Sequence, residues 1–137
     1  MELISKIRRI PVDEFTTPTP FTVSANTSME EVSRVMKDHG IRHVPVISGN
    51  VPVGIISDRD LKVLGKFPSW STFIAEDVMS TNPYTVSPET NIDEVAYYMS
   101  ENKIGSALVQ DEAGSIVGIF TATDALNALV EVIRGEA

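Results

Sequence analysis

A seven-residue pattern that occurs twice in the chain combines residue types that can bind a nucleotide. The copies are GIISDRD at 54–60 and GIFTATD at 118–124, with Gly, a hydroxyl residue and Asp at fixed positions. Where a strand leads into a helix, Gly permits close backbone approach, and a hydroxyl beside helix N-terminal amides can donate to an oxyanion. The Asp can cap the helix, or it can accept two hydrogen bonds from the vicinal diol of a ribose. The pattern therefore indicates either a helix cap or a nucleotide site.

This pattern belongs to a longer internal repeat. When the sequence is aligned with itself at a shift of 63 residues, residues 22–24 match 85–87 and Met36 matches Met99. Ahead of the seven-residue pattern the shift increases to 64, because the second copy has one extra residue. The extra residue falls between stretches that are typical of hairpin turns, where insertions are tolerated best. The chain is therefore a duplicated module, and both copies should share one fold.

Each copy contains the same series of predicted elements. A short strand (21–24 or 84–87) precedes a helix whose apolar residues follow helical spacing. Two β-rich runs then form a hairpin, and a second helix closes the copy. The order is β-α-β-β-α, which predicts a mixed α/β (α+β) fold. One such sheet has too few strands to be stable alone, so we expect two units packed sheet to sheet as a pseudo-twofold pair. The helical stripes comprise Met29, Val32, Val35 and Met36, and Ile92, Val95, Ala96 and Met99.

The ends of the first helix in each copy have recognisable signals. Thr27 and Thr90 each precede an acidic residue by three positions, which resembles a capping box. Gly40 is expected to end the first of these helices in a left-handed conformation, and Asn102 the second.

We divide the chain into an N-terminal segment (1–12), a first copy (13–65), a linker (66–75) and a second copy (76–137). The linker has three aromatic residues that we interpret as packing a core or a dimer interface, namely Phe67, Trp70 and Phe73.

The composition argues against several classes of function. The chain has 137 residues, a formal net charge of −8 and no cysteine. An acidic chain without a basic block is a poor nucleic-acid binder, and the absence of cysteine excludes disulfides, thiolate metal sites and thiolate nucleophiles. No apolar run approaches the roughly 20 residues that span a bilayer, and no secretion signal is present. We expect a cytoplasmic protein that binds neither nucleic acid nor membrane.

Catalysis and metal binding are not expected. His39 and His43 are four residues apart, but they fall on different predicted elements, and the chain has no further histidine. The sequence has no nucleophile elbow, Walker loop or cofactor-type glycine fingerprint. No constellation supplies a positioned base or nucleophile, so the protein is predicted not to be an enzyme and to have no catalytic cofactor.

Residues 16–61 and 77–126 resemble two CBS motifs, the family named after cystathionine beta-synthase. The strand phrases, the capped helix, the hairpin and the closing Gly-to-Asp pattern occur in the family's order, twice. The chain thus resembles a free-standing Bateman module, which is a pair of CBS motifs. The resemblance implies adenosyl ligands such as AMP, ADP, ATP or S-adenosylmethionine, held in clefts between the paired motifs. It also implies a homodimer that forms a disc of four motifs.

The resemblance assigns a role to individual residues. Asp60 and Asp124 would bind the ribose hydroxyls. The phosphate contacts would be Ser57, Arg59, Arg42, His43 and Thr121. The adenine slots would be lined by Thr22, Val23, Val44, Pro45 and Val46 in the first copy, and by Thr85, Val86, Ala107, Leu108 and Val109 in the second.

The two copies differ in the basic residues around the site. Where the first copy has its two arginines and histidine, the second has Gly105, Ser106 and Ala122. Because a diphosphate or triphosphate requires countercharge, we expect the Asp60 cleft to be the stronger anionic site. The Asp124 cleft is expected to be weaker, to prefer a less charged adenosyl compound, or to be empty, unless basic residues of one copy serve the ligand of the other.

The sequence therefore predicts a non-catalytic regulatory module that binds an adenosyl ligand and signals by conformational change to a regulated protein it does not identify. The alternative is a purely structural dimerisation or scaffold module with vestigial ligand clefts. Titration with adenosyl compounds separates the two.

Overall fold

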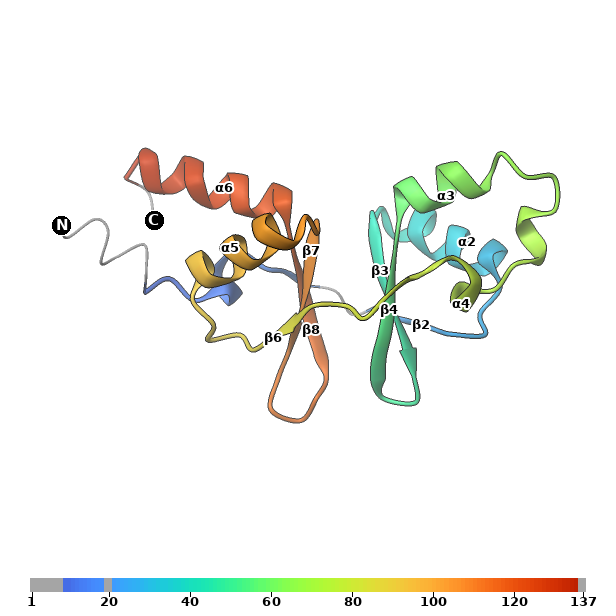
Figure 1. Cartoon of the computed structure of the whole chain (residues 1–137), viewed down its shortest axis with the longest axis horizontal. Coiled ribbons are helices and arrows are strands. Elements are labelled where there is room, and N and C mark those ends of the chain that lie inside the picture. Colours follow the sequence, from blue (N-terminus) through green and yellow to red (C-terminus); the bar gives the residue numbers. More distant parts are fainter. Residues whose placement is uncertain (1–8, 19–20, 136–137) are drawn as a thin grey trace. The chain divides into compact units, whose positions relative to one another are not determined.

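The computed structural model describes residues 9–18 and 21–135, which form two compact units (Figure 1). The first unit comprises the described residues 21–83, and the second unit combines residues 9–18 with 84–135. Most of the N-terminal segment, residues 1–8, lies outside the described residues. Each unit contains one four-stranded sheet, so the mixed α/β class is confirmed.

The first unit has the sheet order β2-β3-β4-β5. Strands β2 and β3 are parallel and are joined through helix α2, whereas the pairs β3–β4 and β4–β5 are antiparallel. A parallel pair needs such a crossover, and an antiparallel pair needs only a hairpin. The elements are β2 (Val23–Ser24), α2 (Met29–His39), β3 (His43–Ser48), β4 (Val51–Ser57), α3 (Asp58–Leu64), η2 (Trp70–Thr72), α4 (Ala75–Val78) and β5 (Ser80–Thr81).

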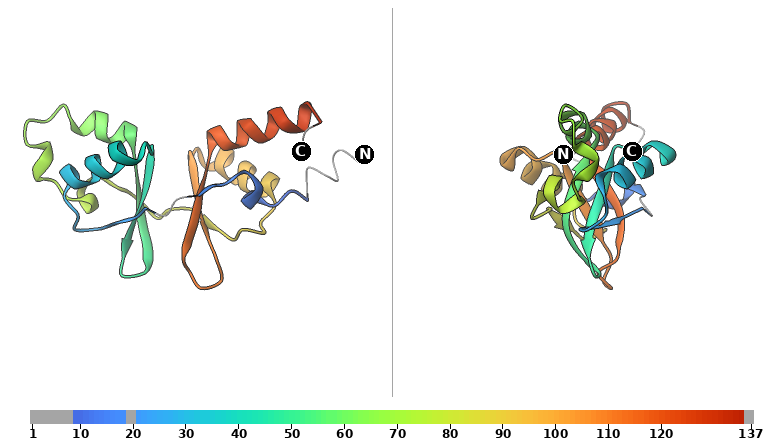
Figure 2. Two further views of the ribbon diagram at one scale, coloured as in Figure 1. Left: turned by 180° about the vertical axis from the view of Figure 1, so that it is seen from behind. Right: turned by 90° about the vertical axis from the view of Figure 1, so that its right-hand side faces the viewer.

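The second unit repeats this topology, with the sheet order β1-β8-β7-β6 (Figure 2). Strands β6 and β7 are parallel, and the pairs β7–β8 and β8–β1 are antiparallel. The predicted β-α-β-β-α order is confirmed in both copies. The elements are η1 (Val12–Phe15), β1 (Thr17–Pro18), β6 (Thr85–Val86), α5 (Ile92–Asn102), β7 (Ser106–Gln110), β8 (Ile116–Thr121) and α6 (Ala122–Ile133).

The fourth strand of each sheet comes from the chain segment that precedes the other copy. Strand β5 precedes the second copy but pairs with β4, and strand β1 precedes the first copy but pairs with β8. The compact units are therefore cut differently from the sequence motifs: residues 13–18 belong to the second unit and 76–83 to the first. An edge strand of only two residues leaves no periodic signal in the sequence. The predicted motif boundaries therefore do not show that β1 and β5 belong to the sheet of the other copy.

The glycine of the repeated pattern permits these edge strands to approach. A Cβ atom at Gly54 would lie 2.8 Å from the carbonyl oxygen of Ser80, and one at Gly118 would lie 2.8 Å from that of Thr17. Real Cβ atoms do not come this close to backbone, so any other residue would push the edge strand away. The close backbone neighbour that requires Gly at these positions is therefore an edge strand of the protein itself, β5 or β1, and not a ligand.

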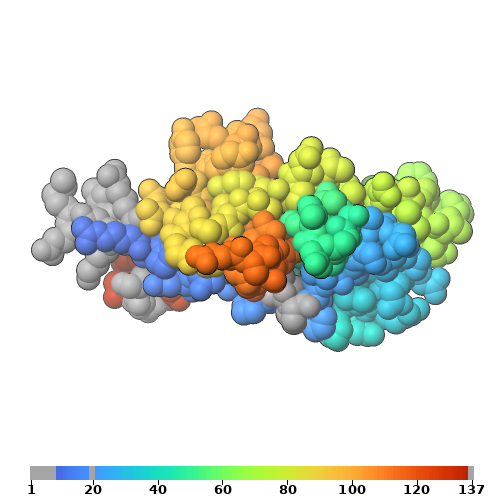
Figure 3. Space-filling view, turned by 90° about the horizontal axis from the view of Figure 1, so that it is seen from below, coloured from blue at the N-terminus to red at the C-terminus, as the bar shows by residue number. Residues whose placement is uncertain are grey.

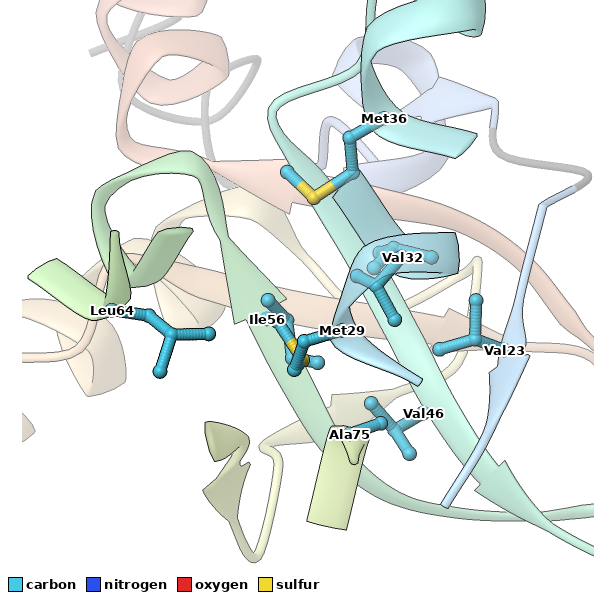
Figure 4. Close-up of a cluster of buried hydrophobic side chains, with 9 residues drawn as sticks. Val23, Met29, Val32, Met36, Val46, Ile56, Leu64 and Ala75 are labelled. Atoms are coloured by element: carbon cyan, nitrogen blue, oxygen red, sulfur yellow. The ribbon is translucent and has the colours of Figure 1, made fainter. Parts of the chain in front are cut away.

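Each unit has a single apolar core between its sheet and its helices. In the first unit, α2 contributes Met29, Val32 and Met36, whose side chains converge on Val46 and Ile56 of the sheet (Figure 4). In the second unit the equivalent helix α5 buries its own stripe. The predicted apolar stripes are thus confirmed at their six central positions, whereas Val35 and Ala96 are only half-buried. The α5 residues of this core are Ile92, Val95 and Met99.

The N-caps of these helices lie one residue later than predicted. Ser28 caps α2, because its Oγ accepts a hydrogen bond from the backbone N of Glu31 at 3.2 Å. Thr27 instead accepts from the backbone N of Ser24 at 3.0 Å and closes the preceding turn. Asn91 occupies the corresponding position of α5. Adjacent hydroxyl residues are both good caps, so the sequence did not distinguish them.

The C-caps agree with the sequence for α2 and differ by one residue for α5. Gly40 ends α2 with φ 62°, as predicted. Lys103, with φ 54°, takes the left-handed position after α5, and Asn102 is the last helical residue.

The linker aromatics mostly pack within the first unit. Trp70 and Phe73 contact its core, so their predicted packing role is confirmed. Phe67 is 55% exposed and does not take part. No helix within residues 9–18 and 21–135 is both long and apolar enough to cross a membrane.

Candidate functional site

Asp60 lies at the start of α3, directly after strand β4. Its Oδ2 accepts a hydrogen bond from the backbone N of Ser57 at 2.8 Å, and its own backbone N donates to Ser57 Oγ at 3.2 Å. This reciprocal pair is a capping box. Of the two roles left open by the sequence, the cap is the one that the structure shows. The cap uses one carboxylate oxygen of a half-buried side chain, and the Ser57 hydroxyl keeps its proton as a donor.

Asp124 forms the same box at the start of α6 but is engaged further. Its Oδ2 accepts from the backbone N of Thr121 at 2.9 Å and from Thr121 Oγ1 at 3.1 Å. Its Oδ1 accepts from Thr17 Oγ1 at 3.1 Å. The residue is 8% exposed. Both oxygens of this carboxylate therefore have partners within the second unit.

Thr17 is a site residue that the sequence analysis missed. It reaches Asp124 because β1 pairs with β8, with Thr17 opposite Ile119. Ser80 has the equivalent place opposite Ile55 in the first unit and is exposed like Thr17, but within the described residues it makes no hydrogen bond to Asp60. Thr17 aligns with Ser80 at the shift of 63, and that pair of hydroxyl residues was the available signal.

The basic residues of the first copy lie where the β3–β4 hairpin leads into α3, the helix that carries Asp60. His43 is paired with Ser57 across the sheet. The backbone N of Asp58 donates to the carbonyl of Arg42 at 2.8 Å, which fixes Arg42 beside the start of α3. Arg59 is exposed in the first turn of that helix. The backbone therefore places three basic residues next to Ser57, and the half-buried Asp58 adds one negative charge in the same turn.

The second copy has the same backbone arrangement without the positive charges. The backbone N of Ala122 donates to the carbonyl of Gly105 at 3.1 Å, and Ser106 is paired with Thr121. Ala122 is the first residue of α6, and Asp58 is the first residue of α3, so these two residues correspond. The residue that corresponds to Arg59 is therefore Thr123 and not Ala122. This corrects one residue of the predicted comparison and leaves the contrast in charge unchanged.

The residues predicted to line adenine slots fall into three groups. Thr22 and Thr85 are exposed. Pro45 and Leu108 are fully buried and point to the opposite sheet face from their neighbours, because side chains alternate along a strand. The others pack on the helix side, so a ligand would meet them through backbone atoms, and their role stays a prediction. This last group is Val23, Val44, Val46, Val86, Ala107 and Val109.

The two histidines lie on different elements, as predicted. His39 ends α2, and its ring stacks on Phe21 with centroids 3.8 Å apart, whereas His43 begins β3. Residues 9–18 and 21–135 contain no group of three or more His, Cys, Asp or Glu side chains arranged to hold a metal ion.

A separate hollow of about 400 Å³ lies in the second unit beside the loop between β7 and β8, which is exposed on the surface shown in Figure 3. Its lining includes three acidic residues, Glu89, Asp111 and Glu112. Asp111 Oδ1 accepts from the backbone N atoms of Ala113 and Ser115, so it closes the turn. An acidic lining is unsuited to a phosphate group.

The sequence matches the family model described as the CBS domain twice, at residues 12–64 and 75–131. Inosine-5′-monophosphate dehydrogenase of Korarchaeum cryptofilum is 38% identical over 103 residues, which are 75% of this chain and 21% of that protein. The chain therefore spans about a fifth of the length of this relative.

Two similar solved structures contain adenosyl compounds. CBSX2 of Arabidopsis thaliana, solved in complex with AMP, is 28% identical with a TM-score of 0.72, over 90% of this chain and 98% of that one. The CBS domain pair of MJ0100, solved with 5′-methylthioadenosine and S-adenosyl-L-methionine, is 28% identical with a TM-score of 0.75, over 88% and 96%. Two family matches that together cover most of the chain, on two units of one topology, show that this protein belongs to the CBS-domain family and contains two CBS motifs.

Proposed function

We propose that this protein is a non-catalytic regulatory module that binds an adenosyl ligand, such as AMP, ADP, ATP or S-adenosylmethionine, chiefly at the first unit. The observation that carries the proposal is the placement of Arg42, His43 and Arg59 next to Ser57 and Asp60, where β4 leads into α3. CBSX2 in complex with AMP and MJ0100 with S-adenosyl-L-methionine support the ligand class.

The proposed contacts use atoms that the fold leaves available. A phosphate would accept from the Ser57 hydroxyl and from the arginines, whose guanidinium groups suit phosphate geometry. Asp60 Oδ1 would accept from a ribose hydroxyl while Oδ2 keeps its bond to the backbone N of Ser57. Ligand binding would therefore leave the start of α3 intact. This arrangement predicts a preference for ribose over deoxyribose.

The second unit is proposed to bind nucleotides more weakly or not at all. Both oxygens of Asp124 are engaged, so a ribose would first have to displace Thr17. The positions that correspond to Arg42 and His43 are Gly105 and Ser106, which supply no countercharge for phosphates.

Regulation would follow from linkage. A ligand that binds one conformation of the module more tightly than another raises the population of that conformation, and a protein partner that distinguishes the two responds. We propose that the module acts as a homodimer, and that its regulated partner is a separate protein or domain.

A structural scaffold is the second candidate, and it is favoured by the capping boxes. Asp60 and Asp124 both stabilise helix starts, a role that requires no ligand. The two functions differ in one property, because a scaffold has no affinity for adenosyl compounds.

Calorimetric titration with AMP, ATP and S-adenosylmethionine tests the proposal. Asp60→Asn is expected to weaken binding about tenfold or more, because a hydrogen bond to a charged group contributes about 1.5–3 kcal/mol. Asp77→Asn is the matched control, since Asp77 Oδ2 accepts from the backbone N of Ile74 at 2.9 Å in the same kind of cap at α4. Absence of binding by the unaltered protein would favour the scaffold, and equal losses in both variants would reject the role of Asp60.

A further inference from the structure

Helix α5 presents aromatic and acidic side chains on its outer side (Figure 1). Its inner side packs in the core of the second unit. On the outer side, Tyr97 is 68% exposed and Tyr98 is 44% exposed. Glu94 lies one helical turn before these tyrosines and Glu101 one turn after them, and both are exposed. Exposed tyrosines are enriched where proteins dock, so this side of α5 is a candidate interaction surface.

The half-buried Tyr84 supports the tyrosine pair from the segment before β6. The rings of Tyr84 and Tyr98 stack with centroids 4.0 Å apart and an interplanar angle of 20°. Burial raises the pKa of the Tyr84 phenol, and the negative charge of Glu94 raises it further, so this carboxylate lies close to the stacked rings. We call this set the α5 surface, and it contains all three tyrosines of the chain: Tyr84, Glu94, Tyr97, Tyr98 and Glu101.

The corresponding helix of the first unit, α2, has an arginine among the same acidic positions. At the shift of 63, Glu94 corresponds to Glu31, Glu101 to Asp38 and Tyr97 to Arg34. Arg34 forms ion pairs with Glu31 and, at 3.7 Å, with Glu30. Helix α2 therefore neutralises its own carboxylates, whereas α5 has a tyrosine in place of the cation.

The carboxylates of the α5 surface have no cation of their own. Within residues 9–18 and 21–135, neither Glu94 nor Glu101 forms an ion pair. The sequence between 84 and 135 contains only two basic residues, Lys103 and Arg134. The positive charge that Arg34 supplies inside the first unit would therefore have to come from outside the second.

We propose that the α5 surface docks an arginine-bearing segment of the protein that this module regulates. The inference rests on the proposed regulatory function and specifies the chemistry of its partner. A guanidinium group can stack on an exposed tyrosine ring while its N–H groups donate to a neighbouring carboxylate. A lysine ammonium has neither a planar face nor a fork of donors, so arginine fits this surface better.

The charges of the α5 surface disfavour other occupants. A second copy that docked through the same surface would place Glu94 and Glu101 against identical carboxylates, and like charges across an interface are unfavourable. Nucleic acids and anionic lipids carry phosphate groups, which the same carboxylates repel. A positively charged protein segment is the occupant that these side chains favour.

The spacing of the two carboxylates suggests the form of the segment. Glu94 and Glu101 are seven residues apart on one helix, which separates them by about 10 Å along the axis. Two arginines three residues apart on an extended chain are also separated by about 10 Å. A segment of the form Arg-x-x-Arg could therefore reach both carboxylates and cross the tyrosine pair between them.

Nuclear magnetic resonance titration with the peptide acetyl-Arg-Gly-Gly-Arg-amide tests the surface. Because all three tyrosines belong to it, the ring signals of tyrosine-labelled protein report this surface and no other. We expect saturable shifts of the Tyr97 and Tyr98 signals, and about threefold weaker binding of acetyl-Lys-Gly-Gly-Lys-amide, which has the same charge. Absence of any shift, or equal affinities for the two peptides, would overturn the proposal.

Single substitutions on α5 locate the binding. Tyr97→Arg gives α5 the residue of α2, so its guanidinium is expected to pair with Glu94 and to weaken binding of the arginine peptide about fivefold. Glu94→Gln is expected to weaken it about threefold, since it removes one carboxylate. Glu112→Gln removes the same charge from an exposed position of the same unit and is the matched control. Unchanged affinity in Tyr97→Arg, or equal losses in Glu94→Gln and Glu112→Gln, would show that the peptide does not dock on α5.

The reciprocal substitution is a test by gain of binding. Arg34→Tyr removes the cation from α2 and leaves Glu31 beside an exposed ring, as on α5. We expect this variant to bind a second equivalent of the arginine peptide, with shifts of the new tyrosine signal. A new tyrosine signal that does not shift at saturation of the α5 surface would contradict the proposed recognition of arginine by a tyrosine and a carboxylate.

These titrations contain no adenosyl compound, so their result is separate from that of the ligand site. Peptide binding without any affinity for adenosyl ligands would reject the proposed function and leave the docking surface standing. Ligand binding at the first unit without peptide binding would do the opposite.

Discussion

At the start of α3, the helix cap takes one carboxylate oxygen of Asp60, whereas at the start of α6 both oxygens of Asp124 have partners within their own unit. The first site has Arg42, His43 and Arg59 as sequence and strand neighbours, whereas the corresponding residues of the second are Gly105, Ser106 and Thr123. The exposed side chains of the two helices also differ: α3 exposes Arg59 and Lys62 beside Val63, whereas α6 exposes four large apolar residues, Leu126, Leu129, Val130 and Ile133. The duplication therefore retained one framework and changed the residues around it.

The comparison also changes the meaning of the repeated pattern. Its Gly admits an edge strand, and its hydroxyl residue and Asp form a capping box, in both units. These are requirements of the fold, so repetition of the pattern alone does not indicate two ligand sites. What distinguishes a ligand site is the set of residues around the pattern.

The largest expected effect comes from filling the glycine positions. Gly54→Ala and Gly118→Ala should each lower the free energy of unfolding by about 3 kcal/mol, because the new methyl group meets backbone of the edge strand. Denaturant unfolding measures this. Gly105→Ala is the control, since a Cβ atom there has no neighbour within 4 Å. A stable Gly118→Ala variant beside an unstable Gly54→Ala variant would show that the two edge strands are not equivalent.

Removal of a positive charge from the first site should lower the affinity for ligands that carry phosphate more than the affinity for ligands that do not. Arg59→Ala is expected to weaken ATP binding about tenfold, or about 1.4 kcal/mol, and to leave S-adenosylmethionine nearly unaffected. Lys62→Ala removes the same charge from the same exposed helix and is the control. If calorimetry finds that both variants lose the same affinity for ATP, then Arg59 acts only through the general electrostatic attraction of the helix and does not contact the phosphates.

The Thr17 contact should have a smaller effect, confined to the second unit. Thr17→Val removes a hydrogen bond to a buried carboxylate and keeps the shape of the side chain, so about 1 kcal/mol of stability should be lost. Ser80→Ala, at the equivalent exposed position, should change stability by less than about 0.5 kcal/mol. If Thr17→Val and Ser80→Ala change the free energy of unfolding equally, then Asp124 does not have a hydrogen-bond partner on its edge strand that Asp60 lacks.

The smallest expected effect concerns the stacked ring pairs. Phe21 stacks on His39 in the first unit, and Tyr84 stacks on Tyr98 in the second. Burial raises the pKa of the Tyr84 phenol above its usual value of 10.0, with further contributions from Glu94 and Tyr98. Its neutral form is therefore favoured in the folded protein, and this contribution to stability is present below pH 10 and is lost as the pH rises beyond it.

Ultraviolet titration of the unaltered protein against Tyr84→Phe measures that pKa. The phenol that titrates in the unaltered protein but not in Tyr84→Phe is expected to have a pKa above 10.0. A pKa at or below 10.0 for this phenol would contradict the assignment.

The sequence predicted the framework well and the details of the site less well. Helices α2 and α5 and the two hairpins follow apolar periodicity, and the repeat doubled that signal. Strands β1 and β5 are two residues long and pair with distant segments, so no local pattern identified them or the contact of Thr17 with Asp124. The contrast in charge between the copies could be predicted because it depends on residue type alone.

The central proposal is that Asp60 holds the ribose of an adenosyl ligand at the first unit. It is tested most directly by titrating AMP and 2′-deoxy-AMP into the unaltered protein, Asp60→Asn and Asp124→Asn. We predict that deoxy-AMP binds about tenfold more weakly than AMP, that Asp60→Asn abolishes this difference, and that Asp124→Asn preserves it. Equal affinities for the two nucleotides in the unaltered protein, or a difference that depends on Asp124 and not on Asp60, would contradict the proposal.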